Sequence, residues 1–176
     1  MLDTLRWFLD KLLGVRKEEK EKRRLSIRIG RELLHLDRMV EMIANGLPEK
    51  PSELIRNKEP HVGVNIPLPH TPIKTNLMAY AEDFDQYETN SCIHSQLRDV
   101  AIGIEQYNTK REIVEELLKK TSQMSFIEDD HLSHLDDESH KFRSIAFKLC
   151  TFFKKTLTTL ENDFGVTYRI QNTEEK

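Results

Sequence analysis

Acid–histidine pairs three residues apart are the part of this sequence best suited to chemistry. The three pairs are Glu32 with His35, Glu128 with His131, and Asp137 with His140. Residues three apart share one face of a helix, so each pair can present a carboxylate and an imidazole to one metal ion. About one such pair is expected by chance in an acid-rich chain with 7 histidines among 176 residues. The pattern therefore makes these residues candidate metal ligands but does not identify a site.

Two kinds of metal site follow from these residues. Two Glu-x-x-His pairs and two further glutamates form the di-iron sites of ferritin-like bundles, and Glu32, His35, Glu128 and His131 would supply the pairs. Alternatively, His131, His134 and Asp137 step by three residues and could hold one zinc ion with an open position. The competing interpretation is a solvated polar segment at the start of a long helix, where the helix dipole favours acids.

Other reactive motifs are missing from the sequence. It has no G-x-S-x-G motif and no phosphate-binding glycine loop. Cys92 and Cys150 lack CxxC spacing and are expected to be buried thiols in a reducing compartment. We therefore expect a non-enzymatic protein without a cofactor. The alternative is a metal-binding helical bundle, with Zn or with Fe or Mn, that has hydrolase or oxidoreductase activity.

The positions of the prolines divide the chain into the helical parts that must position these candidate ligands. All six prolines lie between Pro48 and Pro72, and proline breaks helix interiors. On both sides of this window, apolar residues recur at alternating spacings of three and four, as in helices that pack on one another. We predict an all-α fold, in which residues 15–176 form one bundle of four to five helices with a Pro-rich crossover at residues 47–72.

The first 14 residues are predicted to form a separate amphipathic helix that stops at Gly14. Its apolar side is the predicted partner-binding surface and consists of Leu2, Leu5, Trp7, Phe8, Leu9 and Leu12. A helix this short is marginal alone, so it must dock on its own bundle, a second copy, another protein or lipid. Basic residues between Arg16 and Arg24 favour a peripheral membrane contact, and the glutamates interleaved with them oppose it.

Capping signals and shifts of register predict the helix boundaries. A helix over residues 17–45 should end at Asn45-Gly46, and a break is expected near residues 89–91. Helix starts are predicted at Thr71-Pro72 and at two capping boxes that begin with Thr109 and Ser125. The clearest helix spans residues 141–163 before Gly165.

Core positions and a minor β element complete the prediction. The core residues expected to be buried in one cluster are Leu36, Val40, Leu97, Val100, Leu149 and Phe153. Residues 62–66 and 166–170 alternate apolar and other side chains, which predicts a small two-stranded sheet.

Composition limits the classes of partner. The net charge of −3 disfavours nucleic acid as the main partner, because phosphate binding usually needs a basic excess. No run approaches 18 apolar residues and no secretory apolar region opens the chain, so we expect a cytoplasmic protein. The sequence thus predicts an adaptor or assembly subunit that acts through helix–helix contacts, made by the N-terminal helix with a protein partner or a second copy.

Overall fold

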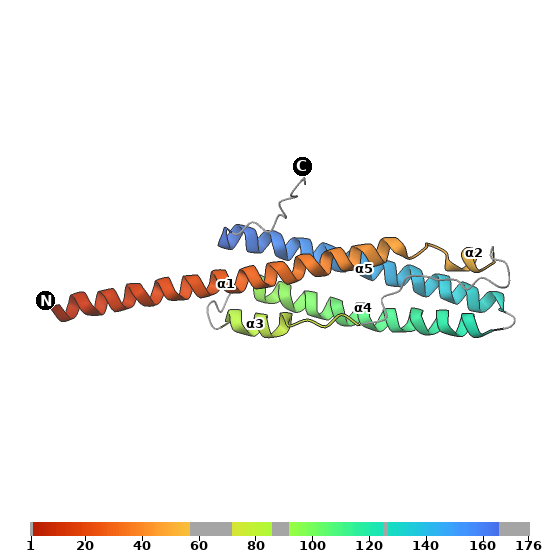
Figure 1. Cartoon of the computed structure of the whole chain (residues 1–176), viewed down its shortest axis with the longest axis horizontal. Coiled ribbons are helices and arrows are strands. Elements are labelled where there is room, and N and C mark those ends of the chain that lie inside the picture. The colour runs from red at the N-terminus through yellow and green to blue at the C-terminus, as the bar shows by residue number, and fades with distance from the viewer. Residues whose placement is uncertain (1, 57–71, 86–91, 125–126, 166–176) are drawn as a thin grey trace, which may run out of the picture.

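The computed structural model describes residues 2–56, 72–85, 92–124 and 127–165, and for residues 2–10 and 85 it describes the backbone alone. Within these residues the chain forms five helices and no strand (Figure 1). They are α1 (Leu2–Gly46), α2 (Pro51–Arg56), α3 (Leu77–Asp85), α4 (Cys92–Gln123) and α5 (Asp129–Phe164). The predicted all-α bundle is confirmed. The predicted strands at residues 62–66 and 166–170 lie outside the described residues.

Helix α5 holds the bundle together. It packs against α4 along one side and against α1 along another, and α2 rests on it near its start. Helix α3 contacts both α4 and α1, so α1, α5, α4 and α3 follow one another around a common core. The result is an elongated bundle in which α5 lies beside both α1 and α4 (Figure 1).

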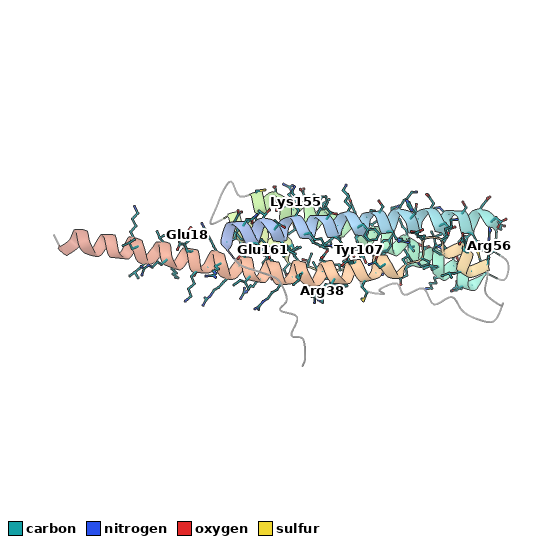
Figure 2. The ribbon with its side chains drawn as sticks, turned by 90° about the horizontal axis from the view of Figure 1, so that it is seen from above. Glu18, Arg38, Arg56, Tyr107, Lys155 and Glu161 are labelled. Carbon is teal, nitrogen blue, oxygen red and sulfur yellow. The ribbon has the colours of Figure 1, made fainter. Side chains whose placement is uncertain are left out.

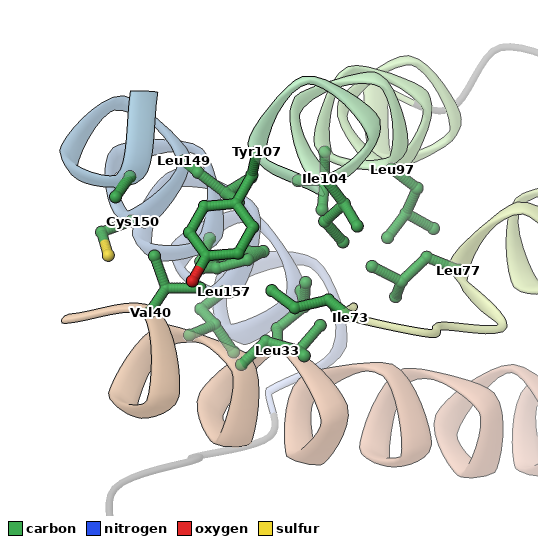
Figure 3. Packing of buried hydrophobic residues seen from close by; sticks show 14 of the residues in the cluster. Leu33, Val40, Ile73, Leu77, Leu97, Ile104, Tyr107, Leu149, Cys150 and Leu157 are labelled. Atoms are coloured by element: carbon green, nitrogen blue, oxygen red, sulfur yellow. The ribbon is translucent and has the colours of Figure 1, made fainter. Parts of the chain in front are cut away.

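The core is a single cluster that draws on every long helix (Figure 3). The six predicted core residues, Leu36, Val40, Leu97, Val100, Leu149 and Phe153, are all buried in it. Helices α4 and α5 approach closely at Gly103, where an added Cβ would lie 2.9 Å from Leu149 Cδ1. The spacing of apolar residues therefore identified the faces that pack together.

Two predicted boundaries are also confirmed. Helix α1 ends at Gly46. The break predicted near residues 89–91, between α3 and α4, lies outside the described residues. Helix α5 ends before Gly165, which has φ +59° and donates its backbone N–H to Glu161 O at 3.0 Å. Glycine adopts this left-handed conformation without steric strain, which explains the sharp stop.

Three predicted helix starts are wrong. Helix α3 begins at Leu77 rather than at Thr71-Pro72, and Thr75 Oγ1 accepts the Leu77 N–H at 3.1 Å. Thr109 lies inside α4, where its hydroxyl donates to Glu105 O. Helix α5 begins at Asp129 with Glu128 at the N-cap position, and Ser125 lies outside the described residues. Threonine also bonds carbonyls within helices, so a capping-box pattern can occur without a helix start.

The predicted stop at Gly14 is wrong as well. Helix α1 runs without a break from Leu2 to Gly46, and an added Cβ at Gly14 would meet nothing within 4 Å. Glycine inside a helix is disfavoured by about 1 kcal/mol relative to alanine, and the strong helix formers around Gly14 outweigh that penalty. The N-terminal segment is therefore a helical continuation of a bundle helix, and it does not fold back onto its own bundle.

The start of the Pro-rich crossover is tied to α5. Ser52 donates its backbone N–H to Asp136 Oδ1 at 2.9 Å, and its hydroxyl also bonds the Asp136 carboxylate. Arg56 forms an ion pair with Asp129 at 2.5 Å. The polar side chains of α2 thus fix it on the first turns of α5.

Candidate functional site

The first half of α1 extends beyond the other helices (Figure 1). Leu25 is the first α1 residue whose side chain is buried in the core, and every side chain from Lys11 to Lys20 is exposed. Residues 2–24 would span about 34 Å as a helix. This extension, which we call the projecting segment, presents a helical surface that no other described element covers.

Exposed apolar side chains lie on the projecting segment. The exposed fractions are 45% for Leu12, 60% for Leu13 and 49% for Val15. Of the six predicted partner-binding residues, Leu12 is thus exposed. Leu2, Leu5, Trp7, Phe8 and Leu9 belong to the helical part of α1, and their side chains lie outside the described part of the structure.

The apolar stripe of α1 repeats outside the bundle. Its core positions are Leu33, Leu36, Val40 and Ile43, all buried. Four heptads earlier, the same positions hold Leu5, Phe8, Leu12 and Val15. Heptad repeats of this kind favour packing against another helix. Between the two stripes the equivalent positions carry the polar residues Glu19, Lys22 and Ser26, so the two apolar surfaces are separate.

The first predicted metal pair has a structural partner. Glu32 Oε1 accepts hydrogen bonds from Thr75 Oγ1 at 2.5 Å and from the Asn76 backbone N–H at 3.2 Å. His35 is exposed on α1. Glu32 therefore fixes the residues that lead into α3, next to the middle of α1.

The second group of predicted ligands lies at the start of α5 and is dispersed. His131 Nε2 lies 2.8 Å from Thr121 Oγ1 at the end of α4, while His134 is exposed. Asp137 accepts a hydrogen bond from Lys141 Nζ at 2.6 Å, and Glu128 makes no side-chain capping bond. Among the described residues, no three His, Cys, Asp or Glu side chains gather closely enough to hold a metal ion.

Sequence reasoning missed an ion pair between α4 and α5 whose carboxylate is buried. Glu138 is 5% exposed and accepts hydrogen bonds from Lys110 Nζ at 2.6 Å and from Lys141 Nζ at 2.9 Å. These two bonds hold the pKa of the Glu138 carboxyl below its ordinary value, despite its burial. Glu138 follows Leu135 by three residues and precedes Phe142 by four, so its position on the buried stripe could have revealed it.

The buried thiol of Cys150 is unsuited to nucleophilic chemistry in this arrangement. Burial, with Asp37 nearby, raises the pKa of Cys150 to about 12, so the thiol stays protonated at neutral pH. Burial also raises the pKa of Asp37, and Lys154 opposes that shift. Cys92 was expected to be buried and is exposed, because it occupies the first residue of α4.

Comparison with known proteins gives no lead on function, because the chain has no significant match among protein-family models, curated proteins or solved structures. Within the described ranges, no helix combines the length and the apolar character needed to cross a bilayer. The projecting segment is therefore the feature from which a function can be argued.

Proposed function

We propose that this protein is a non-enzymatic helical adaptor or assembly subunit, and that the projecting segment of α1 supplies its helix–helix contact with a protein partner or a second copy. The observation that carries the proposal is that α1 leaves the bundle before Leu25 while its heptad pattern resumes further out, at Leu12 and Val15. An apolar stripe with heptad spacing gains stability when a second helix covers it.

The position of this surface suits an assembly role. The core begins at Leu25, so the projecting segment is free to bind without disturbing the packing of α1 on α5. Because the helix continues through Gly14 into the bundle, a partner bound at its tip is held at a fixed direction relative to the bundle. A rigid extension of this kind joins two bodies without a flexible linker.

Comparison of the full-length protein with a variant that lacks residues 1–13 tests the proposal. The truncated chain should keep its helical circular dichroism and its unfolding transition, because none of the described core residues is removed. Light scattering should show a loss of self-association, or partner pull-down should show a loss of binding. Unfolding of the truncated body would mean that the segment belongs to the core, and unchanged assembly would overturn the proposal.

A matched pair of double variants separates this surface from non-specific apolar association. Changing both Leu12 and Val15, which are 45% and 49% exposed, to serine should abolish the contact. Serine at Met78 and Ile102 removes apolar side chains of similar exposure, 44% and 46%, from other parts of the protein. This control should assemble like the unchanged chain, and an equal loss in both variants would contradict the proposed location.

A further inference from the structure

A row of basic residues follows the outer side of α1, away from the apolar stripe. Lys17, Arg24, Arg31 and Arg38 occupy every seventh position, so they share one heptad position, and all four are exposed. The row is about 32 Å long at 1.5 Å per residue. Figure 2 shows Arg38 on the side of α1 that faces away from α5, opposite to Glu18.

Further positive charge flanks this row. Lys20 and Arg28 each lie four residues from Arg24 and are exposed, which brings the face to six basic residues. Three acids adjoin them: Glu21 lies among them, Glu41 follows Arg38 by three residues and pairs with Lys154, and Asp10 occupies the same heptad position seven residues before Lys17. Within the described part of the chain, none of the six basic residues forms an ion pair, whereas the neighbouring Lys22 is bound to Glu18 at 3.3 Å. We call these six residues the basic row.

Charge is distributed unevenly along the chain. Residues 1–31 hold ten basic and five acidic residues, so this part carries +5 although the whole chain carries −3. The remainder therefore carries −8. A basic face on one edge of an otherwise acidic protein orients the molecule toward a negatively charged surface.

Apolar side chains lie at both ends of the basic row. Leu13 precedes Lys17 by four residues and is 60% exposed, and Met42 follows Arg38 by four residues and is 69% exposed. A polyanion in water offers phosphates but no apolar phase for these two side chains. The surface of a bilayer offers both, because basic residues meet anionic headgroups while apolar side chains enter the acyl boundary.

We infer that the outer face of α1 docks the protein on an anionic lipid surface, with α1 lying along the membrane plane. The basic row supplies the electrostatic attraction, and Leu13 and Met42 supply short apolar contacts at its ends. The apolar heptad stripe lies on a different side of α1. The inference therefore goes beyond the adaptor role, and it places the proposed assembly at a membrane surface.

Co-sedimentation of the full-length chain with vesicles tests this inference. Binding is expected to phosphatidylcholine vesicles that contain phosphatidylserine, to weaken with added salt, and to be absent for phosphatidylcholine alone. Changing Arg24, Arg31 and Arg38 to glutamine should lower the partition coefficient about 100-fold, since each basic residue contributes about fivefold. Equal binding to both kinds of vesicle would overturn the electrostatic assignment.

A control variant with the same change in net charge tests whether the position of the basic residues matters for vesicle binding. Arg98, Lys119 and Lys155 are exposed on α4 and α5, and their change to glutamine should leave vesicle binding unchanged. If this control loses as much binding, net charge alone is responsible and the docking face is wrong. If Arg24, Arg31 and Arg38 prove necessary for binding RNA or an acidic protein but not vesicles, the lipid assignment is also wrong.

Two further measurements test the apolar contacts with lipid and distinguish lipid binding from the adaptor role. Serine at Leu13 and Met42 should weaken vesicle binding, and serine at Met78 and Ile102 should not. Self-association should survive the loss of Arg24, Arg31 and Arg38, because these residues lie outside the heptad stripe. A variant that fails in vesicle binding but still assembles would thus support the lipid face independently of the adaptor proposal.

Discussion

The side-chain amide of Asn108 pairs with both backbone polar groups of Ile73. Asn108 Oδ1 accepts the Ile73 N–H at 2.8 Å, and Asn108 Nδ2 donates to Ile73 O at 2.9 Å. Ile73 lies in the segment that leads into α3, and its side chain is buried in the core. One amide on α4 thus holds an irregular segment against the bundle and satisfies a backbone that has no helical partner there.

Replacing Asn108 with alanine should therefore destabilise the fold by about 1–3 kcal/mol, because it leaves a donor and an acceptor of Ile73 unpaired. Urea unfolding followed by circular dichroism measures this change. Gln106 is exposed on the same helix, and its replacement by alanine is the control with little expected effect. Equal stabilities of the two variants would show that water replaces the amide without loss.

Two phenylalanines of α5, Phe153 and Phe147, should respond differently to truncation. Phe153 is fully buried, so Phe153→Ala should reduce the free energy of unfolding by about 3–5 kcal/mol. Phe147 is 42% exposed, with the Arg143 guanidinium 5.9 Å from its ring centre, and its truncation should change stability by less than about 1 kcal/mol. Denaturant titration compares the two, and a small effect at Phe153 would contradict the assigned core.

Two glycines inside helices should respond in opposite directions to larger side chains. Gly14→Ala meets open space and should stabilise the projecting segment by up to about 1 kcal/mol, through helix propensity. Gly103→Val must displace Leu149 and should destabilise the bundle by about 1–3 kcal/mol. Amide hydrogen exchange near residue 14 and thermal unfolding measure the respective effects. Slower exchange after Gly14→Ala would also confirm that the helix is continuous there.

Acid should weaken the Glu138 ion pair. The pKa of Glu138 in the folded protein lies below its ordinary value of 4.5, so the pair stabilises the fold above that value. The contribution is lost as the pH falls through the lower folded-state pKa. Glu138→Gln should thus be less stable than the unchanged chain at neutral pH, with the difference shrinking in acid. Urea unfolding over a pH series measures this difference.

An exposed pair provides the control for Glu138. Lys120 holds the pKa of Glu116 below its ordinary value, but both side chains are exposed to solvent. Solvent screening leaves such pairs with little net effect on stability. Glu116→Gln should therefore leave the pH dependence nearly unchanged. A constant difference between Glu138→Gln and the unchanged chain at every pH would contradict the assigned role of the Glu138 carboxylate.

The two histidines at the start of α5 distinguish a hydrogen bond from a metal site. His131→Ala breaks the contact with Thr121 and should lower the melting temperature, whereas His134→Ala removes an exposed side chain and should not. A metal site would make both variants lose bound metal and stability together, because an ion that binds the folded state stabilises it. Elemental analysis and melting curves with zinc, iron and manganese decide between these outcomes.

Local periodicity is enough to predict much of this fold. The spacing of Leu36 and Val40, or of Leu149 and Phe153, states which face of a helix is apolar and must be buried. Gly165 ends α5 because few other residues adopt its backbone conformation. These features depend on residues within a few turns of one another, so the sequence alone determined the helical class, the core faces and the stop at Gly165.

The partners of polar side chains depended on the tertiary structure. Glu32 bonds Thr75 and Asn76, and Glu138 bonds Lys110 on another helix. Spacing along one helix places Glu32 beside His35 but does not reveal which distant segment faces the pair. That choice is made when the helices pack, because only then is each buried carboxylate matched to a donor.

The length of α1 also depended on how the helices pack in the tertiary structure. The sequence has an apolar stripe before Gly14 and another after Leu25, and this pattern predicts two helices. Whether Gly14 stops a helix depends on the left-handed conformation and on what covers the flanking turns, and neither is encoded in the glycine itself. The sequence by itself thus determined that the first turns of the chain carry a row of apolar side chains. Only the tertiary structure directed them away from their own bundle, because α3 and α5 cover α1 from Leu25 onward and not before it.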